Sequence, residues 1–178
     1  MEDTFSFRLL SKGDEESFFQ LVDSNRGRLE NFFAGTVARN KDLSETTLFV
    51  SDVLEKIANN IYFPFVIIEN ELEKIVGYID VKNIDWNIPK GELGFFIDQN
   101  FEGKGIVKKI LSKVIRHCMD DMKFNKLFLR THELNAGTRH VAEKNGFKVE
   151  GIIRNDYRTT DGKLVDLIYY GLVREANS

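Results

Sequence analysis

Apolar residues in the first sixty positions recur mostly at helical spacing, after one short stretch that alternates. Alternation of apolar and polar residues is typical of a half-buried strand, and recurrence every three or four residues is typical of a helix with one buried face. Asp42 and Glu45 form a capping-box pattern where the longest of these helices begins. The pattern predicts a strand at 5–9, a helix from Ser11 or Asp14, a short helical piece at 29–33 after a polar break at 24–28, and a helix at about 43–59.

From residue 62 onwards the pattern changes to short runs rich in β-branched and aromatic residues. Such runs, separated by polar turns, predict strands. One long helical pattern interrupts them and carries an apolar stripe. The predicted elements are strands at 62–68, 75–81, 92–97, 126–130, 147–153 and 164–173, helices at 103–123 and 136–145, a loop at 83–90 that contains Trp86, and a hairpin turn at Asp161-Gly162. This order predicts an α/β protein with a mixed sheet.

Composition and charge narrow the class of protein. The chain has 178 residues, 42% of them apolar and 30% charged, which predicts a single globular domain over residues 1–178. No apolar run approaches the ~20 residues of a membrane span, and we expect no signal peptide in the acidic N-terminus. The net charge of −3 argues against direct nucleic-acid binding. A single cysteine, Cys118, excludes an internal disulfide framework and favours a reducing compartment, the cytoplasm.

The most informative segment runs from a strand directly into a glycine-containing turn and a long helix. Gly103 and Gly105 lie in this turn, within residues 99–109. The first N–H groups of a helix have no partner inside it, so they can bind an anion, and glycine lets a phosphate approach the backbone. Lysines at 104, 108 and 109 oppose the helix dipole unless a bound anion offsets them. The residues alone leave two interpretations open, a phosphate site or glycines that only tighten a turn.

Several other kinds of site do not fit the residues. A P-loop needs a hydroxyl residue after its Gly-Lys pair, whereas Gly105 follows Lys104 here. The dinucleotide-binding fingerprint needs a third glycine at the position of Lys108. The three histidines lack metal-ligand spacing and one cysteine cannot supply a zinc set, so we predict no metal site.

Two motifs resemble those of the GNAT acetyltransferase superfamily. Asn100-x-x-Gly103-x-Gly105 resembles the family's Gln/Arg-x-x-Gly-x-Gly/Ala turn, which binds the coenzyme A pyrophosphate. The stretch from Asn135 to Phe147 resembles the family's Asn-x-x-Ser-x-x-x-x-Glu-Lys-x-Gly-Phe motif. The tail over 151–169 resembles the RimJ/RimL branch, which acetylates N-terminal amines of ribosomal proteins. The resemblance covers about residues 5–172.

The resemblance implies a GNAT-like fold, with a mixed, mostly antiparallel central sheet and helices on both faces. It also implies an N-acetyltransferase that uses acetyl-CoA as cosubstrate and needs no metal. The residues that it implies for coenzyme A binding are Phe95, Phe96, Ile97, Asn100, Phe101, Gly103, Lys104, Gly105, Ile106, Val107, Lys108, Asn135 and Thr138.

The chain departs from the family pattern at three positions. Asn100 replaces the usual Gln or Arg, which removes one long polar contact but leaves the backbone of the turn intact. Thr138 stands where the branch usually has Ser, and it keeps the hydroxyl. Lys109 replaces a frequent Glu, so the start of the helix is more positive than usual.

The catalytic roles start from the need to deprotonate the amine nucleophile. We expect Glu92 to be the base, directly or through water; the alternative is a solvated carboxylate at a strand end. His132, at the end of a strand, is a second candidate base. Trp86 and Tyr157 lie in predicted loops that could line the acceptor groove, or they could simply pack there.

The remaining roles come from the resemblance. A backbone N–H in Phe95-Phe96-Ile97 would polarise the thioester carbonyl, while the aromatic side chains belong to the core. Thr138 would give a proton to the departing thiolate or bind its sulfur; alternatively its hydroxyl makes a local backbone bond. Asn135 caps the following helix and could also contact the pantetheine arm.

The function that we predict is direct acetyl transfer to a primary amine, without an acyl-enzyme, and most readily to a protein N-terminal α-amine. Two alternatives stay open: a small amine such as a polyamine or an aminoglycoside, and a non-catalytic coenzyme A sensor. A nucleotide-phosphate binder is disfavoured by the missing P-loop hydroxyl and third glycine. The apolar face of the last strand (Ile168, Tyr170, Leu172) predicts a homodimer, as in the resembling branch. We expect neither a nucleic acid nor a membrane as a partner.

Overall fold

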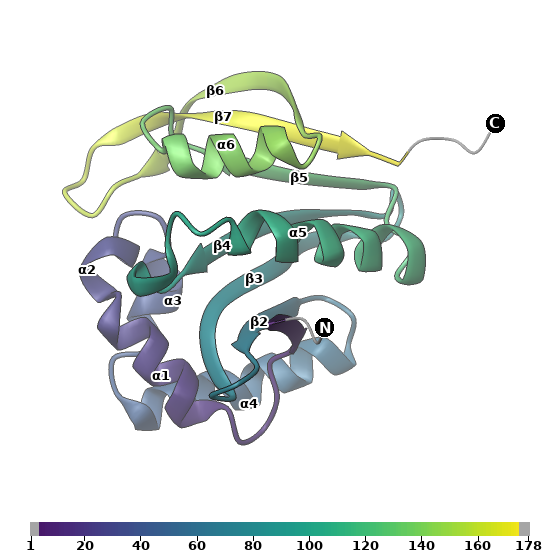
Figure 1. The fold of residues 1–178 in the computed structure, drawn as a ribbon. Helices are drawn as coiled ribbons and strands as arrows, with labels where there is room; N and C mark the ends of the chain where they lie inside the picture. The colour runs from purple at the N-terminus through teal and green to yellow at the C-terminus, as the bar shows by residue number, and fades with distance from the viewer. Residues whose placement is uncertain (1–3, 175–178) are drawn as a thin grey trace. The chain divides into compact units, whose positions relative to one another are not determined.

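A computed structural model describes residues 4–174 of the chain (Figure 1). Six α-helices and seven strands lie within this range. In chain order they are β1 (Phe5–Leu9), α1 (Glu15–Ser24), α2 (Arg26–Leu29), α3 (Ala34–Ala38), α4 (Leu43–Ala58), β2 (Phe63–Glu69), β3 (Lys74–Asp85), β4 (Lys90–Ile97), α5 (Ile106–Arg116), β5 (Lys126–Thr131), α6 (Ala136–Lys144), β6 (Lys148–Arg158) and β7 (Leu164–Val173).

The seven strands form one mixed sheet in the order β1-β2-β3-β4-β5-β7-β6. The β1–β2, β5–β7 and β6–β7 pairs are antiparallel, and β4–β5 is parallel. The predicted mixed, mostly antiparallel sheet is therefore confirmed. The parallel pair is short, because only Lys90–Glu92 of β4 pairs with Lys126–Phe128 of β5.

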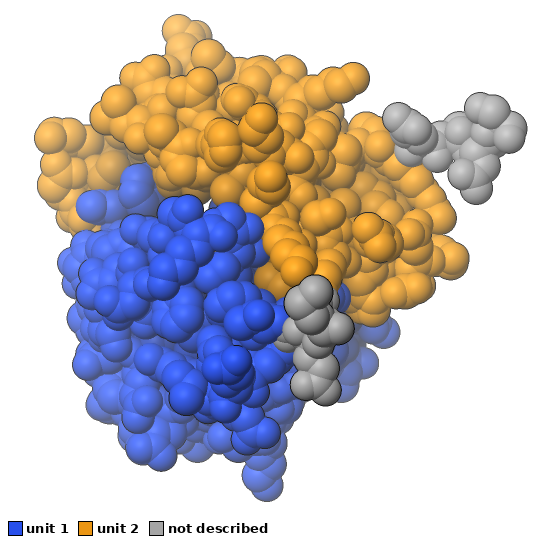
Figure 2. Space-filling model, viewed as in Figure 1, with its two compact units in different colours: residues 1–80, 95–106 blue, residues 81–94, 107–178 orange. Residues whose placement is uncertain are grey.

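The described chain folds into two compact units, each built from two separate segments (Figure 2). Unit 1 contains residues 4–80 and 95–106, and unit 2 contains residues 81–94 and 107–174. Both β3 and β4 run from one unit into the other. The assignment of residues 1–178 to one domain stays a prediction, and its first three and last four residues lie outside the described range.

The core of unit 1 forms where α1 and α4 cover the N-terminal strands. Phe18 of α1 is fully buried and stacks on Phe49 of α4, with ring centroids 5.6 Å apart. The same ring lies 5.1 Å from Tyr78 of β3, and Tyr78 lies 5.5 Å from Phe96 of β4. Such aromatic contacts hold β4 to the helical layer, and Phe96 is a core residue, as its sequence position suggests.

In unit 2, α6 packs beside β7, and β7 pairs with β5 and β6 (Figure 1). The buried Tyr170 of β7 connects strand and helix, because its hydroxyl accepts from Arg139 Nε at 3.3 Å and donates to Glu143 at 3.1 Å. Gly91 of β4 permits close packing of its strand against the side chains of Val81 and Phe124. A Cβ at Gly91 would lie 2.7 Å from Val81 and 3.0 Å from Phe124, so only glycine fits without movement of these side chains.

Three predicted elements have different bounds in the structure. The loop predicted at 83–90 is shorter in the structure, since β3 continues to Asp85 and β4 begins at Lys90, which leaves a turn at 86–89 that contains Trp86. Asn83 adopts a φ of 49°, a left-handed conformation that Asn tolerates. The strand therefore continues through this polar stretch before it turns into β4. The helix predicted at 103–123 is α5 followed by a π-helical turn at His117–Asp121. The strand predicted at 147–153 is longer, because β6 extends to Arg158 through two register irregularities.

The short helical piece predicted at 29–33 is also misplaced. The structure has α2 at Arg26–Leu29 and α3 at Ala34–Ala38 on either side of it. The carbonyl of Asn25 accepts from the N–H groups of Arg28 and Leu29, which starts a helix inside the predicted polar break. Polar residues form this helix because Asn25 is buried against other polar groups, which an apolar pattern does not indicate.

Candidate active site

The turn after β4 is shaped by its own side chains. Asp98 is 2% exposed, and one of its carboxylate oxygens accepts from both the backbone N–H and the side-chain Nδ2 of Asn100, each at 2.9 Å. This capping starts a 3-10 turn at Gln99–Phe101. Asn100, at the position of the family's Gln or Arg, therefore has both its side chain and its backbone N–H committed to the turn.

Two residues near the end of α1 anchor the same turn within unit 1. The buried Asn25 accepts from the backbone N–H of Gln99 at 3.0 Å and from Arg28 Nη1 at 2.8 Å, and its own Nδ2 donates to Leu21 O at 2.9 Å. Arg28 also forms an ion pair with Glu102. Because these side chains hold both the start and the end of the 3-10 turn, its backbone is fixed before any ligand binds.

The two glycines of the motif adopt left-handed backbone conformations, with φ of +71° at Gly103 and +72° at Gly105. A Cβ built at either position would meet no atom within 4 Å. Open space and glycine conformations together fit an approach of a bulky anion to the backbone. The helix α5 begins at Ile106, directly after Gly105, so its unpaired N–H groups continue the same stretch.

The lysines around this turn differ in what they contact. Lys104 Nζ donates to Asn100 O at 2.9 Å and lies 5.0 Å from the centroid of the Phe101 ring. Its charge therefore stays within the turn. Lys108 is exposed in the first turn of α5, together with Lys109. A cation at this end of a helix is unfavourable by itself and becomes favourable beside a bound polyanion.

The last residues of β4 present backbone N–H groups on alternate sides. The N–H of Asp98 donates to Val76 O of β3 at 2.8 Å, so by strand alternation the N–H of Phe96 also faces β3. The N–H groups of Phe95 and Ile97 then point away from β3. Of the three residues predicted to polarise a carbonyl, Phe95 and Ile97 have N–H groups that do not face β3, whereas Phe96 contributes to the core.

In unit 2, Glu92 lies in a network of charged and polar side chains. It is 6% exposed, so the alternative of a solvated carboxylate at a strand end is wrong. Its Oε1 accepts from Arg130 Nε and its Oε2 from Arg130 Nη2, both at 3.1 Å, and Asn83 Nδ2 donates to Oε2 at 2.6 Å. The third guanidinium nitrogen, Nη1, donates to Asp156 at 2.9 Å. One arginine thus joins two carboxylates.

Burial alone would lower the pKa of Arg130, but hydrogen bonds and the negative charges of Glu92 and Asp156 raise this pKa above its ordinary value. The guanidinium is therefore a permanent cation in the network. Sequence reasoning missed Asn83, Arg130 and Asp156. The available signal was Arg130 itself, a charged residue at the end of the apolar run Leu127–Leu129, where a buried charge requires a partner.

The start of α6 carries the second predicted motif. The Oδ1 of Asn135 accepts from the backbone N–H of Thr138 at 3.1 Å, which confirms Asn135 as the N-cap. Thr138 is half-buried in the first turn of this helix. The Nδ1 of His132 accepts from Leu134 N at 3.2 Å, so one ring nitrogen is already used locally.

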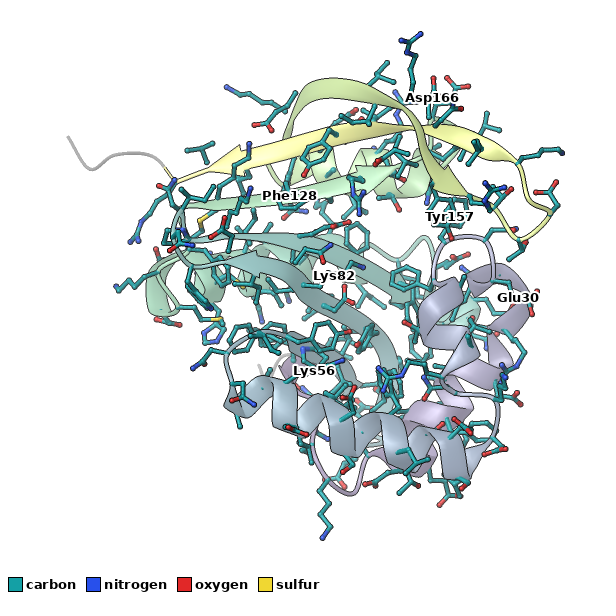
Figure 3. All side chains as sticks on the ribbon, turned by 180° about the vertical axis from the view of Figure 1, so that it is seen from behind. Glu30, Lys56, Lys82, Phe128, Tyr157 and Asp166 are labelled. Atoms are coloured by element: carbon teal, nitrogen blue, oxygen red, sulfur yellow. The ribbon has the colours of Figure 1, made fainter. Side chains whose placement is uncertain are left out.

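The two aromatic candidates for the acceptor groove lie in different surroundings. Trp86 is 42% exposed and packs against Phe124, with centroids 4.8 Å apart. Tyr157 lies within β6, not in a loop, and is partly buried (Figure 3). Burial raises the pKa of Tyr157, while Lys82 of β3 acts in the opposite direction.

Two further features are absent from residues 4–174. No three His, Cys, Asp or Glu side chains in that range come together in a way that could hold a metal ion. None of the helices in the same range is long and apolar enough to cross a membrane.

Comparison with known proteins assigns the chain to a family. Residues 5–148 match the acetyltransferase (GNAT) domain. Over 172 residues the chain is 30% identical to YdaF of Bacillus subtilis strain 168, which has a provisional name as a ribosomal N-acetyltransferase; the match covers 95% of this chain and 91% of YdaF.

Solved structures show the same fold. The ribosomal-protein-S5-alanine acetyltransferase of Vibrio fischeri superimposes with a TM-score of 0.87 at 19% identity, over 97% of this chain and 94% of the other. RimL, a ribosomal L7/L12 alpha-N-protein acetyltransferase in complex with coenzyme A, gives 0.88 at 18%, over 97% and 95%. The chain therefore belongs to the GNAT acetyltransferase family and is an acetyl-CoA-dependent N-acetyltransferase.

Proposed function

We propose that the acceptor is the α-amine at the N-terminus of a protein, of the ribosomal-protein type. The name of YdaF supports this acceptor. Chemistry favours it as well, because an α-amine has a pKa near ~7.7–8.0 against ~10.4 for lysine, so deprotonating lysine at neutral pH requires roughly 3 kcal/mol more. A ribosomal acceptor would place the reaction in the cytoplasm.

The observation that carries the proposed mechanism is the buried Glu92 carboxylate, held in place by Arg130 and Asn83. A base that is shielded from water and fixed in orientation suits proton removal from a bound amine. Glu92 takes the proton of the attacking amine, directly or through one water. His132 is the weaker candidate, because its Nδ1 is engaged by Leu134 N.

The coenzyme A part of the substrate is proposed to lie along the anchored turn and the start of α5. The left-handed Gly103 and Gly105 leave the backbone open to a pyrophosphate. Asn135 would contact the pantetheine arm in addition to its role as N-cap. The residues proposed for this contact are Asn100, Phe101, Gly103, Lys104, Gly105, Ile106, Val107 and Lys108, with Asn135 and Thr138.

The acetyl transfer itself is proposed as one direct attack. The amine nitrogen forms a bond to the thioester carbon, and the N–H of Phe95 or Ile97 stabilises the oxyanion that develops. The C–S bond then breaks, and the second proton lost by the attacking nitrogen passes to the departing thiolate through the Thr138 hydroxyl, which gives one proton and takes up another, or Thr138 only holds the sulfur. An acyl-enzyme on Cys118 is disfavoured, since burial raises the pKa of this thiol to about 12.

A homodimer is proposed through β6, not through the face first expected. Of that face, Tyr170 is buried against α6, and Ile168 and Leu172 are half-buried. The exposed apolar residues within β6 are Val149, Ile152 and Ile153, at 57%, 64% and 43% exposure, whereas those of β7 are confined to its two end residues, Leu164 and Val173. Light scattering tests this proposal: a mass of 20.6 kDa, that of one chain, at working concentration would contradict it.

An acceptor screen tests the function. Release of coenzyme A is measured with peptides that have a free N-terminus but no lysine, with the same peptides N-terminally blocked and carrying a lysine, and with spermidine and an aminoglycoside. Activity on the free N-terminal peptides alone is expected. Activity confined to spermidine or the aminoglycoside would assign a small-amine acceptor instead, and acetyl-CoA binding with no acceptor in the set would support a sensor.

A further inference from the structure

Arg130 occupies a position that its strand pairing determines. In the β4–β5 ladder Glu92 lies opposite Phe128, and Arg130 is two residues further along β5, on the same face as Phe128. This is the diagonal relationship in which a long side chain reaches back to its cross-strand neighbour. Figure 3 labels Phe128, Lys82 and Tyr157, which come from the β5, β3 and β6 strands of this unit.

Arg130 fixes the orientation of the Glu92 carboxylate through two hydrogen bonds. Two parallel N–H donors, Nε and Nη2, bind its two oxygens, so the carboxylate plane follows the guanidinium plane. The remaining nitrogen contacts Asp156 of β6. Across the β5–β7 ladder, Arg130 pairs with Tyr169, whose ring stacks on Phe128 at 5.0 Å. The guanidinium is thus held by contacts to β4 and β6, while the backbone of Arg130 is held by its pairing with β7.

The three hydrogen-bonded groups of this cluster are unequal in charge. Two carboxylates, Glu92 and Asp156, share one guanidinium, which gives a local formal charge of −1 from these three groups. These three groups by themselves therefore do not repel a second cation, such as an acceptor ammonium. Without Asp156 the Arg130 cation would neutralise Glu92 completely.

We propose that Arg130 is the positioning residue of the base: it holds Glu92 in the orientation for proton acceptance, and Asp156 in turn holds Arg130. This inference rests on the proposed function of Glu92. It predicts that Arg130 acts on the rate only through Glu92. Two residues that act as one unit show non-additive losses when both are changed, whereas independent residues show losses that multiply.

A double-mutant cycle tests the proposal. Arg130→Gln should lower kcat by about 10- to 100-fold, because a misplaced base loses most of its effect. The Michaelis constant for acetyl-CoA should stay unchanged. The double variant Glu92→Gln/Arg130→Gln should be no slower than Glu92→Gln alone. Arg130→Lys, which keeps the charge but not the fork, should lie between Arg130→Gln and wild type, and it replaces Arg130→Gln in the cycle if that variant does not fold.

The control variant is Lys126→Gln. Lys126 lies on the same strand as Arg130 and pairs with Glu150 of β6 at 2.6 Å. The substitution therefore removes a β5–β6 ion pair about as exposed as the Arg130–Asp156 pair, without changing any contact of Glu92. It should keep near-wild-type kcat. Losses that multiply in the double variant, or an Arg130→Gln enzyme at wild-type rate, would overturn the proposal. So would a slow Arg130→Gln enzyme combined with a fully active Glu92→Gln enzyme.

These outcomes separate the inference from the proposed function. The cycle can be run with any amine that the wild-type enzyme accepts, so a wrong acceptor leaves it intact. A fully active Glu92→Gln enzyme would remove both the base assignment and this inference. A slow Glu92→Gln enzyme with fully active Arg130 variants would remove the inference alone.

Discussion

The side-chain oxygen of Asn25 lies 3.0 Å from the backbone nitrogen of Gln99 and accepts its hydrogen bond, although the two residues are 74 positions apart. Asn25 closes α1 and Gln99 opens the turn that leads to α5. The turn thus takes its position from a helix end that contains none of the family motif residues. A residue outside the motif can therefore control the shape of the motif.

Asn25→Ala should weaken acetyl-CoA binding several-fold. The substitution leaves the N–H of Gln99 without its partner and removes the bonds to Arg28 and Leu21 O, and each buried group left unpaired costs about 1–3 kcal/mol. Calorimetry with acetyl-CoA measures the change in affinity, and thermal unfolding measures the change in stability. Asn59→Ala is the control, because Asn59 makes the same side-chain bond to a carbonyl four residues earlier, but at an exposed helix end. Unchanged affinity in a folded Asn25→Ala enzyme would contradict the prediction.

Gly105→Ala should lower both stability and acetyl-CoA affinity. An alanine at φ +72° carries a backbone penalty of roughly 1–2 kcal/mol, although its Cβ would meet no atom of the chain. Gly162→Ala separates the two effects, because Gly162 has a φ of +84° and equally open space in the β6–β7 turn. Both variants should lose similar stability in thermal unfolding. Only Gly105→Ala should change affinity in calorimetry, and equal affinities would argue against the turn as the binding site.

The elements that could be predicted from sequence are those governed by local rules. The cap of Asp42 on Glu45 N at 2.8 Å and the cap of Asn135 on Thr138 N follow from residue type and spacing alone. The β3–β4 hairpin could not be predicted, because a left-handed Asn83 carries the strand through a polar stretch. The short helix α2 escaped because it buries a single apolar residue, Leu29, which is too few for a helical apolar pattern.

The residues of the candidate site also fall into two groups, those that the sequence could predict and those that it could not. Glu92, Asn135 and Thr138 could be named from the motifs and from the chemistry of the reaction. The partners of Glu92 could not, because Arg130 is 38 residues away and reaches it only through the register of two parallel strands. No local pattern encodes that register. Asp156 depends in addition on the irregular part of β6.

Stability should depend on pH through Asp14. Burial alone would raise the pKa of Asp14, but hydrogen bonds from Arg8 and from the backbone of Ser11 lower it below the ordinary value. A carboxyl whose pKa is lower in the folded state stabilises that state when ionised. This contribution is present above the unfolded pKa of ~3.9 and is lost as pH falls through the folded pKa.

Asp14→Asn should therefore destabilise the protein at neutral pH by roughly 1 kcal/mol, a figure that allows for solvent screening around the half-exposed Arg8. The difference from wild type should vanish in acid, where both states of the wild type carry a protonated Asp14. Urea unfolding at several pH values measures this. Asp23→Asn, which breaks the exposed pair with Arg26, should show little change at any pH. A constant Asp14→Asn defect down to pH 3 would argue against the assignment.

The last prediction concerns the two proposed catalytic groups, which should respond differently to pH. Glu92→Gln should lower kcat by ~10²–10⁴ with little change in acetyl-CoA affinity, because the variant cannot accept a proton. The defect should shrink as pH rises, since free amine then forms without help. Thr138→Ala removes the hydroxyl proposed to assist the thiolate, so its defect should persist at high pH. Thr138→Ser keeps the hydroxyl and should stay near the wild-type rate.

Initial rates of coenzyme A release over a range of pH separate these cases. If Glu92→Gln and Thr138→Ala both keep near-wild-type rates at every pH on an accepted amine, positioning alone drives the transfer and both role assignments are wrong. If His132→Ala alone abolishes the pH-dependent step, the base is His132. In that case the bonds from Arg130 and Asn83 to Glu92 would have a structural role, while the anchored turn and its two glycines would keep their proposed role in binding acetyl-CoA.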